Sequence, residues 1–266
     1  MNTKQIIEKW YKTLGFPARY DAEFYEALEN IEIGAPAIES YDVEEKDGRR
    51  NFLSFLYMCE RLSERYREKG VSDEILLDTL YDIGRWLDVW SELEGGLYLG
   101  ELHWLRLHMG MGLFKLGRLQ FAFGKSHHDI PEKGIKKGDN IIEAHIPRTG
   151  PLKREECERS FELAKEFFAK YYPEYEYKYF TCHSWLMDES LTSLLPEDSN
   201  ILKFRDMFEV FCAEESYAAL RFIFKWNAKK TDIASFEAKT SLEKNIKAWV
   251  LDGKKLYHAL GVIEKS

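Results

Sequence analysis

Residues 139–200 restrict the possible folds more than any other stretch of the sequence. A strand-like run at 140–146 is followed by a Gly/Pro loop at 147–151, an amphipathic helix pattern over about 153–172, and a second strand-like run at 177–185. A Gly/Pro turn that leads into a helix between two strands is typical of a βαβ unit. We therefore expect two neighbouring strands joined by a crossover helix.

Basic residues gather where this helix is expected to begin, at Arg148, Lys153 and Arg154. Cations there oppose the helix dipole, which favours negative charge at a helix start. A bound anion would reverse that cost, because free backbone N–H groups at a helix start favour phosphates. Our hypothesis is an anion-binding loop. The alternative is that the nearby glutamates, Glu155, Glu156 and Glu158, neutralise these side chains in solvent.

Composition narrows the class of protein. The chain has 266 residues, of which 45% are hydrophobic and 32% charged, as is typical of a globular protein. Its net charge is −8 and it has no long basic run, which argues against a nucleic-acid-binding protein. The sequence has no signal-peptide pattern, no apolar segment long enough to span a membrane and no CxxC pair. We expect a cytoplasmic protein with reduced, mostly buried thiols. The sequence leaves the oligomeric state open.

The first part of the chain is expected to be helical. Apolar residues recur at three- and four-residue steps within 6–14, 24–31, 52–62, 75–90 and 101–108, separated by Gly and Pro. A loop is expected at 34–48. Helical patterns joined by short loops indicate a bundle, so we assign residues 1–110 to a helical N-terminal domain and 111–266 to a second domain.

The second domain mixes strand and helix patterns. Alternating apolar residues at 119–123 predict a strand that pairs antiparallel with 140–146. After the βαβ unit we expect a short helix at 189–195 and a helix over about 200–211, capped by Asp198 or Ser199. A strand at 217–226, a helix from Thr240 or Ser241 to Leu251 and a strand at 256–263 follow. The predicted fold class is α+β or α/β, with a mixed sheet flanked by helices.

Several of these segments resemble a bacterial family of acyltransferase-domain proteins. They are residues 114–121 (FKLGRLQF), 146–152 (IPRTGPL), 182–186 (CHSWL), 198–201 (DSNI) and 240–242 (TSL), within about 113–263. Members of this family join a helical N-terminal domain to a C-terminal domain similar to the GNAT N-acetyltransferase fold. The resemblance implies acetyl-CoA or another acyl-CoA as the donor and a small amine or similar nucleophile as the acceptor.

The resemblance also implies where the cofactor binds. In GNAT enzymes a loop with the pattern Gln/Arg-x-x-Gly-x-Gly/Ala wraps the pyrophosphate of coenzyme A. Arg148 and Gly150 echo that pattern here, although the spacing is shorter and Pro151 removes one N–H donor. The cofactor-binding residues implied in this way are Arg148, Thr149, Gly150, Lys153 and Arg154, together with Asn200 at the start of a later helix.

Acyl transfer to an amine needs a base for the amine proton and an acid for the leaving thiolate. Glu143 and His145 lie on one face of the strand at 140–146, so either is a candidate base, acting through a water. Tyr257 or Tyr217 is the candidate acid. The alternative is that Glu143 and His145 belong to a solvated sheet face.

Two further arrangements invite interpretation. Cys182 and His183 are adjacent on a strand and point to opposite faces, so His183 cannot activate Cys182, and we expect a buried structural cysteine. The sequence His127-His128-Asp129 lacks a third ligand at a characteristic spacing, so we predict no metal site.

The leading hypothesis is therefore an acyl-CoA-dependent N-acyltransferase. The main alternative is a non-catalytic ligand-binding or interaction protein of the same fold, and a third is a hydrolase that uses Cys182 or Ser184.

Overall fold

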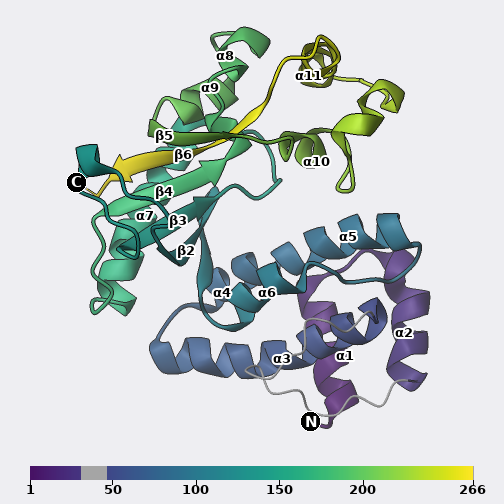
Figure 1. Cartoon of the computed structure of the whole chain (residues 1–266). Coiled ribbons are helices and arrows are strands. Elements are labelled where there is room, and N and C mark those ends of the chain that lie inside the picture. Colours follow the sequence, from purple (N-terminus) through teal and green to yellow (C-terminus); the bar gives the residue numbers. More distant parts are fainter. Residues whose placement is uncertain (31–46, 266) are drawn as a thin grey trace. The chain divides into compact units, whose positions relative to one another are not determined.

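The computed structural model describes residues 1–30 and 47–265. The loop expected at 34–48 lies outside these residues, apart from Asp47 and Gly48, which begin a helix. The chain divides into two compact units, Met1–Leu116 and Gly117–Ser266 (Figure 1). The domain boundary placed between residues 110 and 111 lies just before this division and stays a prediction.

The first unit is helical, as predicted, and ends in a short strand. Its helices are α1 (Thr3–Leu14), α2 (Asp21–Asn30), α3 (Gly48–Lys69), α4 (Asp73–Leu80), α5 (Asp82–Glu94) and α6 (Leu102–Met109), and its strand is β1 (Leu113–Leu116). The single pattern at 75–90 is divided between α4 and α5. Capping residues define several helix ends. Asn2 forms a capping box at the start of α1, and Gly70 ends α3 in the left-handed conformation.

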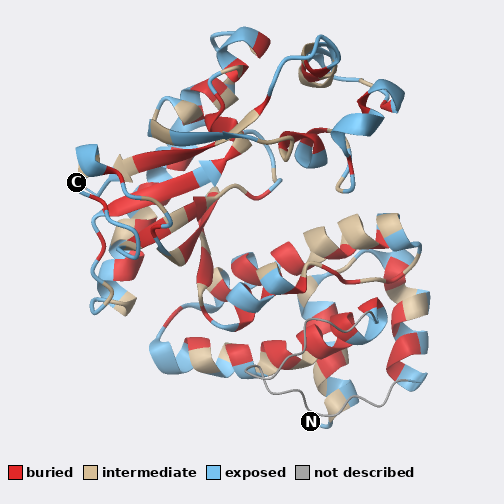
Figure 2. Ribbon diagram, in the orientation of Figure 1, coloured by how far each residue is buried: buried red, intermediate tan, exposed pale blue. Residues whose placement is uncertain are grey.

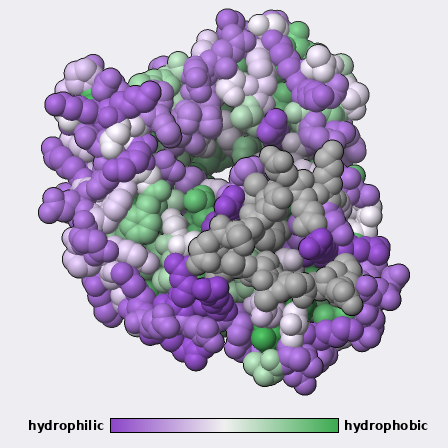
Figure 3. Space-filling view, turned by 60° about the horizontal axis from the view of Figure 1, so that its bottom comes forward, coloured by the Kyte–Doolittle hydropathy of each residue, from purple (hydrophilic) through white to green (hydrophobic). Residues whose placement is uncertain are grey.

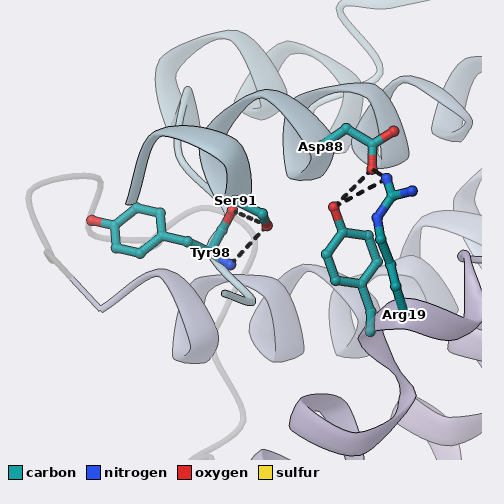
Figure 4. A network of polar contacts seen from close by, with 5 residues as sticks. Arg19, Asp88, Ser91 and Tyr98 are labelled. Carbon is teal, nitrogen blue, oxygen red and sulfur yellow. Dashed lines mark hydrogen bonds and ion pairs between the residues drawn. The ribbon is translucent and has the colours of Figure 1, made fainter. Parts of the chain in front are cut away.

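Polar contacts tie the helices of this unit together. The Asp88 carboxylate accepts hydrogen bonds from Arg19 and from the Tyr20 hydroxyl, the latter at 2.8 Å. Nearby, the backbone N–H of Tyr98 donates to the Ser91 hydroxyl at 3.1 Å (Figure 4). Asp88 and Ser91 both lie on α5, so these bonds link that helix to the segment before α2 and to the segment after α5.

A mixed sheet forms the frame of the second unit. Its strands are β2 (Leu119–Lys125), β3 (Asn140–His145), β4 (Tyr179–Ser184), β5 (Glu209–Glu215) and β6 (Tyr257–Glu264), and β1 adds to its edge in the order β1-β2-β3-β4-β6-β5. As predicted, β2 and β3 are antiparallel. Strands β3 and β4 are parallel and joined by α7 (Arg154–Tyr171), which confirms the βαβ unit.

The two faces of the sheet are covered differently. Phe121 and Phe180 pack on Phe161 of α7, with ring centroids 5.4 and 5.1 Å from it. The opposite face carries a smaller apolar cluster of Ile130, Ile135, Tyr179, Leu260 and Val262. Figure 2 shows the central strands mostly buried. Because Phe180 faces α7, the even-numbered residues of β3 and β4 lie on the side of that helix, and the odd-numbered ones lie on the opposite face. We call this opposite face the uncovered face, since α7 does not cover it.

Two predictions in the last third of the chain were wrong. The helix at 200–211 ends early: α9 is Asn200–Arg205, and residues that follow it form β5. The strand at 217–226 is instead the helix α10 (Ala219–Ile223). Leu220 and Ile223, three residues apart, enter an apolar cluster, whereas Phe222, which an alternating strand would bury with Leu220, is 42% exposed. The buried residues are thus spaced as in a helix and not as in an alternating strand, which is why this segment is helical.

The other elements of this region follow the sequence closely. They are α8 (Leu191–Leu194), α11 (Ser241–Leu251) and β6. Ser199 caps α9 through the N–H of Ile201, and Thr240 forms a capping box with Glu243 on α11.

Charged and polar residues dominate the face of the molecule drawn in Figure 3, with smaller hydrophobic areas between them. Among the described residues, no helix combines the length and the apolar character that crossing a membrane requires.

Candidate functional site

The sheet of the second unit opens between β3 and β4. Within the described chain, their pairing ends at Glu143 and Thr181, although β3 continues to His145 and β4 to Ser184. Each strand stays paired on its other side, because His145 faces Gln120 of β2 and Ser184 faces Ala259 of β6. The carboxyl ends of two parallel strands therefore diverge, and such a place is where open α/β sheets bind ligands.

The loop after β3 leads from this opening to the start of α7. Gly150 has a φ of 61°, a left-handed conformation that glycine adopts without strain. Lys153, at the N-cap of α7, makes no side-chain capping bond. The first N–H groups of a helix have no partner within it, so this helix start offers donors to an anion.

Arg118, which the sequence analysis did not select, holds this loop. Its guanidinium donates to the carbonyl oxygens of Pro147 at 3.0 Å, Gly150 at 3.2 Å and Pro151 at 3.0 Å. Burial lowers the pKa of Arg118, but an arginine keeps its charge at neutral pH. The only sequence signal was its place in the segment 114–121.

The basic residues predicted to bind the cofactor lie around the same loop, and two of them are already paired. The ammonium of Lys153 lies 3.2 Å from the Glu156 carboxylate, and Arg154 lies 2.7 Å from Glu158. These pairs match the alternative reading of the sequence, although their side chains are solvent-exposed and surface pairs of this kind are weak. Arg148 is exposed, and the Thr149 N–H donates to the Pro147 carbonyl at 2.7 Å.

Asn200 is the first residue of α9 and is exposed. Because α9 packs beside α7, Asn200 belongs to the same side of the sheet as the loop.

The uncovered face of the sheet carries ionisable side chains beside the opening. Glu143 lies next to Thr181 across β3 and β4, so alternation puts Glu143, His145 and His183 on one face. The Glu143 carboxylate lies 3.5 Å from His145 Nε2. The His183 side chain is 41% exposed, more than that of either predicted base. The structure thus adds a third candidate base.

Two more side chains adjoin His183. The ring of His258 on β6 lies 4.3 Å from the His183 ring, centroid to centroid, and the Glu214 carboxylate of β5 lies 3.9 Å from His183 Nε2. Burial lowers the pKa of His183, although Glu214 acts in the opposite direction. Burial, with a smaller contribution from His183, lowers the pKa of His258 to about 4. Both imidazoles are therefore mostly uncharged at pH 7.

The ligating atoms of His183, Glu214 and His258 lie within 4.8 Å of one another, so these residues could hold a metal ion. In the sequence, His183 stands out only as a neighbour of Cys182, and no local pattern marks Glu214 or His258. They lie on strands far apart in the chain.

The side chains of the remaining candidates leave the sheet from the face opposite His183. Tyr257 is adjacent to His258, so its side chain leaves the opposite face of β6, while its N–H donates to the buried Asp188 carboxylate at 2.7 Å. Cys182 is 1% exposed, and burial raises its pKa to about 12. A thiol in that environment stays protonated, which does not suit a nucleophile.

Two protein-family models together match almost the whole length of the chain. The model of the N-acyltransferase N-terminal domain matches residues 4–111, and that of the GNAT-like C-terminal domain matches residues 113–263. No curated protein matches the sequence.

Crystal structures of acyltransferases share the fold. A mutant acyltransferase with octanoyl-CoA is 19% identical, with a TM-score of 0.76 over 97% of this chain and 87% of that chain. An acyltransferase with decanoyl-CoA and teicoplanin is 19% identical, with a TM-score of 0.73 over 98% of this chain and 99% of that chain. The GNAT-like model covers more than half of the sequence, and the N-acyltransferase model covers most of the remainder. The chain therefore belongs to the family of proteins in which an N-acyltransferase N-terminal domain precedes a GNAT-like C-terminal domain.

Proposed function

We propose that this protein transfers an acyl group from an acyl-CoA to an amine of a small molecule. The observation that carries the proposal is the opening between β3 and β4. The loop held by Arg118 borders this opening at the end of β3, and His183 borders it on the uncovered face.

The donor would bind at the loop. The N–H groups at the start of α7 suit a pyrophosphate, and we assign direct contacts to Arg148, Thr149, Gly150, Lys153 and Arg154, with Asn200 as a further contact. The amide-containing arm of coenzyme A would lie along the diverging ends of β3 and β4 and pair with their backbones, as extended peptides do. Acyltransferases of the same fold crystallised with octanoyl-CoA and decanoyl-CoA support an acyl-CoA donor.

The acceptor would approach from the uncovered face. Its amine nitrogen attacks the thioester carbonyl, a C–N bond forms, and the C–S bond then breaks to release the coenzyme A thiolate. We assign His183 as the base that takes the amine proton, because its imidazole is the most exposed of the candidates.

The other candidates receive different roles in this proposal. The negative charge of Glu143, next to His145, would attract the amine in its ammonium form. Tyr257 remains the proposed acid for the thiolate, since β6 begins at Tyr257 and this end of β6 lies beside the carboxyl end of β4.

The test is an acyl-transfer assay with acetyl-, octanoyl- and decanoyl-CoA against a panel of amines, with products measured by mass spectrometry. We expect His183→Gln to lower kcat by at least about 100-fold, the range typical of acid–base catalysis, with donor binding retained. The matched control is His103→Gln, an exposed histidine of α6, which should keep the wild-type rate.

The other outcomes are also informative. An unchanged rate for His183→Gln would remove His183 as the base. Binding of coenzyme A without transfer to any amine would favour the non-catalytic ligand-binding alternative, and absence of binding would overturn the proposal.

A further inference from the structure

Three metal-binding side chains converge on the uncovered face of the sheet. His183, His258 and Glu214 come from β4, β6 and β5, which are consecutive in the sheet. His183 lies opposite Leu260, two residues from His258, so both histidines lie on the same face. Rigid neighbouring strands therefore hold the two imidazoles side by side.

A β-bulge brings the third ligand onto this face. Phe211 pairs with Leu260, and a regular ladder would then put Ala213 opposite His258. The register instead shifts by one residue, so that Glu214 faces His258. Cys212, within the bulge, has a φ of 52°, a left-handed conformation that is unfavourable for a residue other than glycine.

The bulge has a chemical consequence. Bulges re-aim side chains and occur often next to functional sites, and strained residues gather at such sites. Without the shift, Glu214 would leave β5 from the opposite face, away from both histidines.

The ligand set indicates which ions the site suits. Two imidazoles and one carboxylate are a ligand set found in zinc sites that keep an open coordination position. Nitrogen and oxygen ligands of this kind also bind Co²⁺ and Ni²⁺. The ligating atoms lie within 4.8 Å of one another, and zinc bonds of about 2.0–2.2 Å need only a modest approach of partly exposed side chains. The ring centroid of His128 lies 6.1 Å from that of His183, which puts His128 beside the three ligands.

We propose that His183, His258 and Glu214 form a binding site for a divalent transition-metal ion such as Zn²⁺, and that a bound ion inhibits acyl transfer. The ion would occupy the imidazole lone pair with which His183 accepts the amine proton. Metal binding stands on the geometry alone, whereas the inhibition rests on the proposed function.

The direct test uses Co²⁺ as a spectroscopic probe of the whole protein, after treatment with a chelator, and Zn²⁺ in calorimetric titrations. We expect one ion per chain, with a visible absorption band in the Co²⁺ form. Glu214→Gln and His258→Gln should each weaken binding at least about tenfold, since each removes a ligand. Glu215→Gln is the matched control, because Glu215 pairs with Lys255 at 2.7 Å and is not part of the ligand set.

Thermal unfolding of the metal-free variants shows whether each is folded. Equal affinity of the wild-type protein and both folded ligand variants would overturn the site. If one ligand variant does not fold, the affinity of the other variant and the one-to-one stoichiometry of the wild-type protein decide whether the site exists.

The activity measurement separates this inference from the proposed function. Zn²⁺ should inhibit the wild-type enzyme at concentrations at least about tenfold below those that inhibit Glu214→Gln, because inhibition follows binding. Metal binding without any acyl transfer would leave the site standing and remove the proposed function. Transfer that Zn²⁺ leaves unaffected at saturation would remove the inhibitory role.

Discussion

Arg118 shows how one side chain shapes a loop through its carbonyl groups. In a trans peptide the C=O and the following N–H point in opposite directions. The carbonyls of Pro147 and Pro151 point to the Arg118 guanidinium, so the N–H groups of Arg148 and Leu152 point away from it. The third carbonyl, of Gly150, precedes Pro151, which has no N–H to direct. Arg118 thus fixes the direction of backbone N–H groups in this loop, although Pro151 contributes none.

This geometry predicts a specific effect on donor binding. Lysine keeps the positive charge but cannot bond three carbonyls in the planar arrangement of a guanidinium. We expect Arg118→Lys to raise KM for the acyl-CoA by at least about tenfold, as the loss of one or two charged hydrogen bonds implies. The kcat at saturation should stay near the wild-type value, because the reacting groups are unchanged.

Steady-state kinetics at several donor concentrations measure both parameters. Arg159→Lys, on the exposed surface of α7, is the matched control and should change neither. A normal KM in Arg118→Lys would show that the loop keeps its shape without the three bonds.

At the scale of elements, Ser160 joins α7 to the turn between β1 and β2. Its hydroxyl oxygen accepts hydrogen bonds from the N–H groups of Arg118 at 2.7 Å and Leu119 at 3.3 Å, and the hydroxyl donates to the Glu156 carbonyl at 2.9 Å. Gly117 permits this approach, because a Cβ there would lie 2.8 Å from the Ser160 Oγ, and its φ is 70°. The turn that carries Arg118 is thereby fixed to the helix whose start borders the opening.

Removing that hydroxyl should destabilise the fold. Ser160→Ala leaves backbone N–H donors without their acceptor at a fully buried position, which costs about 1–3 kcal/mol. Chemical denaturation should show this loss in the free energy of unfolding. The control Ser235→Ala removes a hydroxyl that is exposed and should stay within about 0.5 kcal/mol of the wild-type value. The same free energy of unfolding for Ser160→Ala and Ser235→Ala would mean that a water molecule accepts the hydrogen bonds that the Ser160 hydroxyl accepts in the wild-type protein.

The elements that the sequence predicted are those with strong local signals. The βαβ unit combines an alternating strand, a Gly/Pro loop and an amphipathic helix, all readable within a short window. Strand β5 carries mostly exposed residues and gains its hydrogen bonds from β6, far along the chain. Its periodicity along the sequence is therefore weak, and the helix predicted at 200–211 takes in only its first residues, 209–211.

The candidate site divides in the same way. The basic loop could be predicted from the sequence, because its residues lie close together along the chain. The approach of His183, His258 and Glu214 was not, because it depends on the order of β4, β6 and β5 and on a one-residue bulge. Neither feature has a signal in the spacing of those residues along the sequence.

Of the two compact units of the chain, the second carries the proposed donor site. The loop, Arg118 and the ionisable face all lie within Gly117–Ser266. This unit has its own buried apolar clusters, one around α10 and α11 and one on the uncovered face of the sheet. A ligand that binds here should stabilise this unit directly.

Coenzyme A at a hundred times its Kd should add about 2.7 kcal/mol to the free energy of unfolding. For a chain of this size that corresponds to a rise in Tm of roughly 5–10 °C, measured by calorimetry. Hydrogen exchange followed by mass spectrometry should show the new protection in peptides that cover 147–157, because the loop and the first turn of α7 would donate to the pyrophosphate. Arg118→Lys should reduce both effects, and Arg159→Lys should reduce neither. A rise in Tm without protection of 147–157 would place the cofactor elsewhere in the chain and overturn the assignment of the loop.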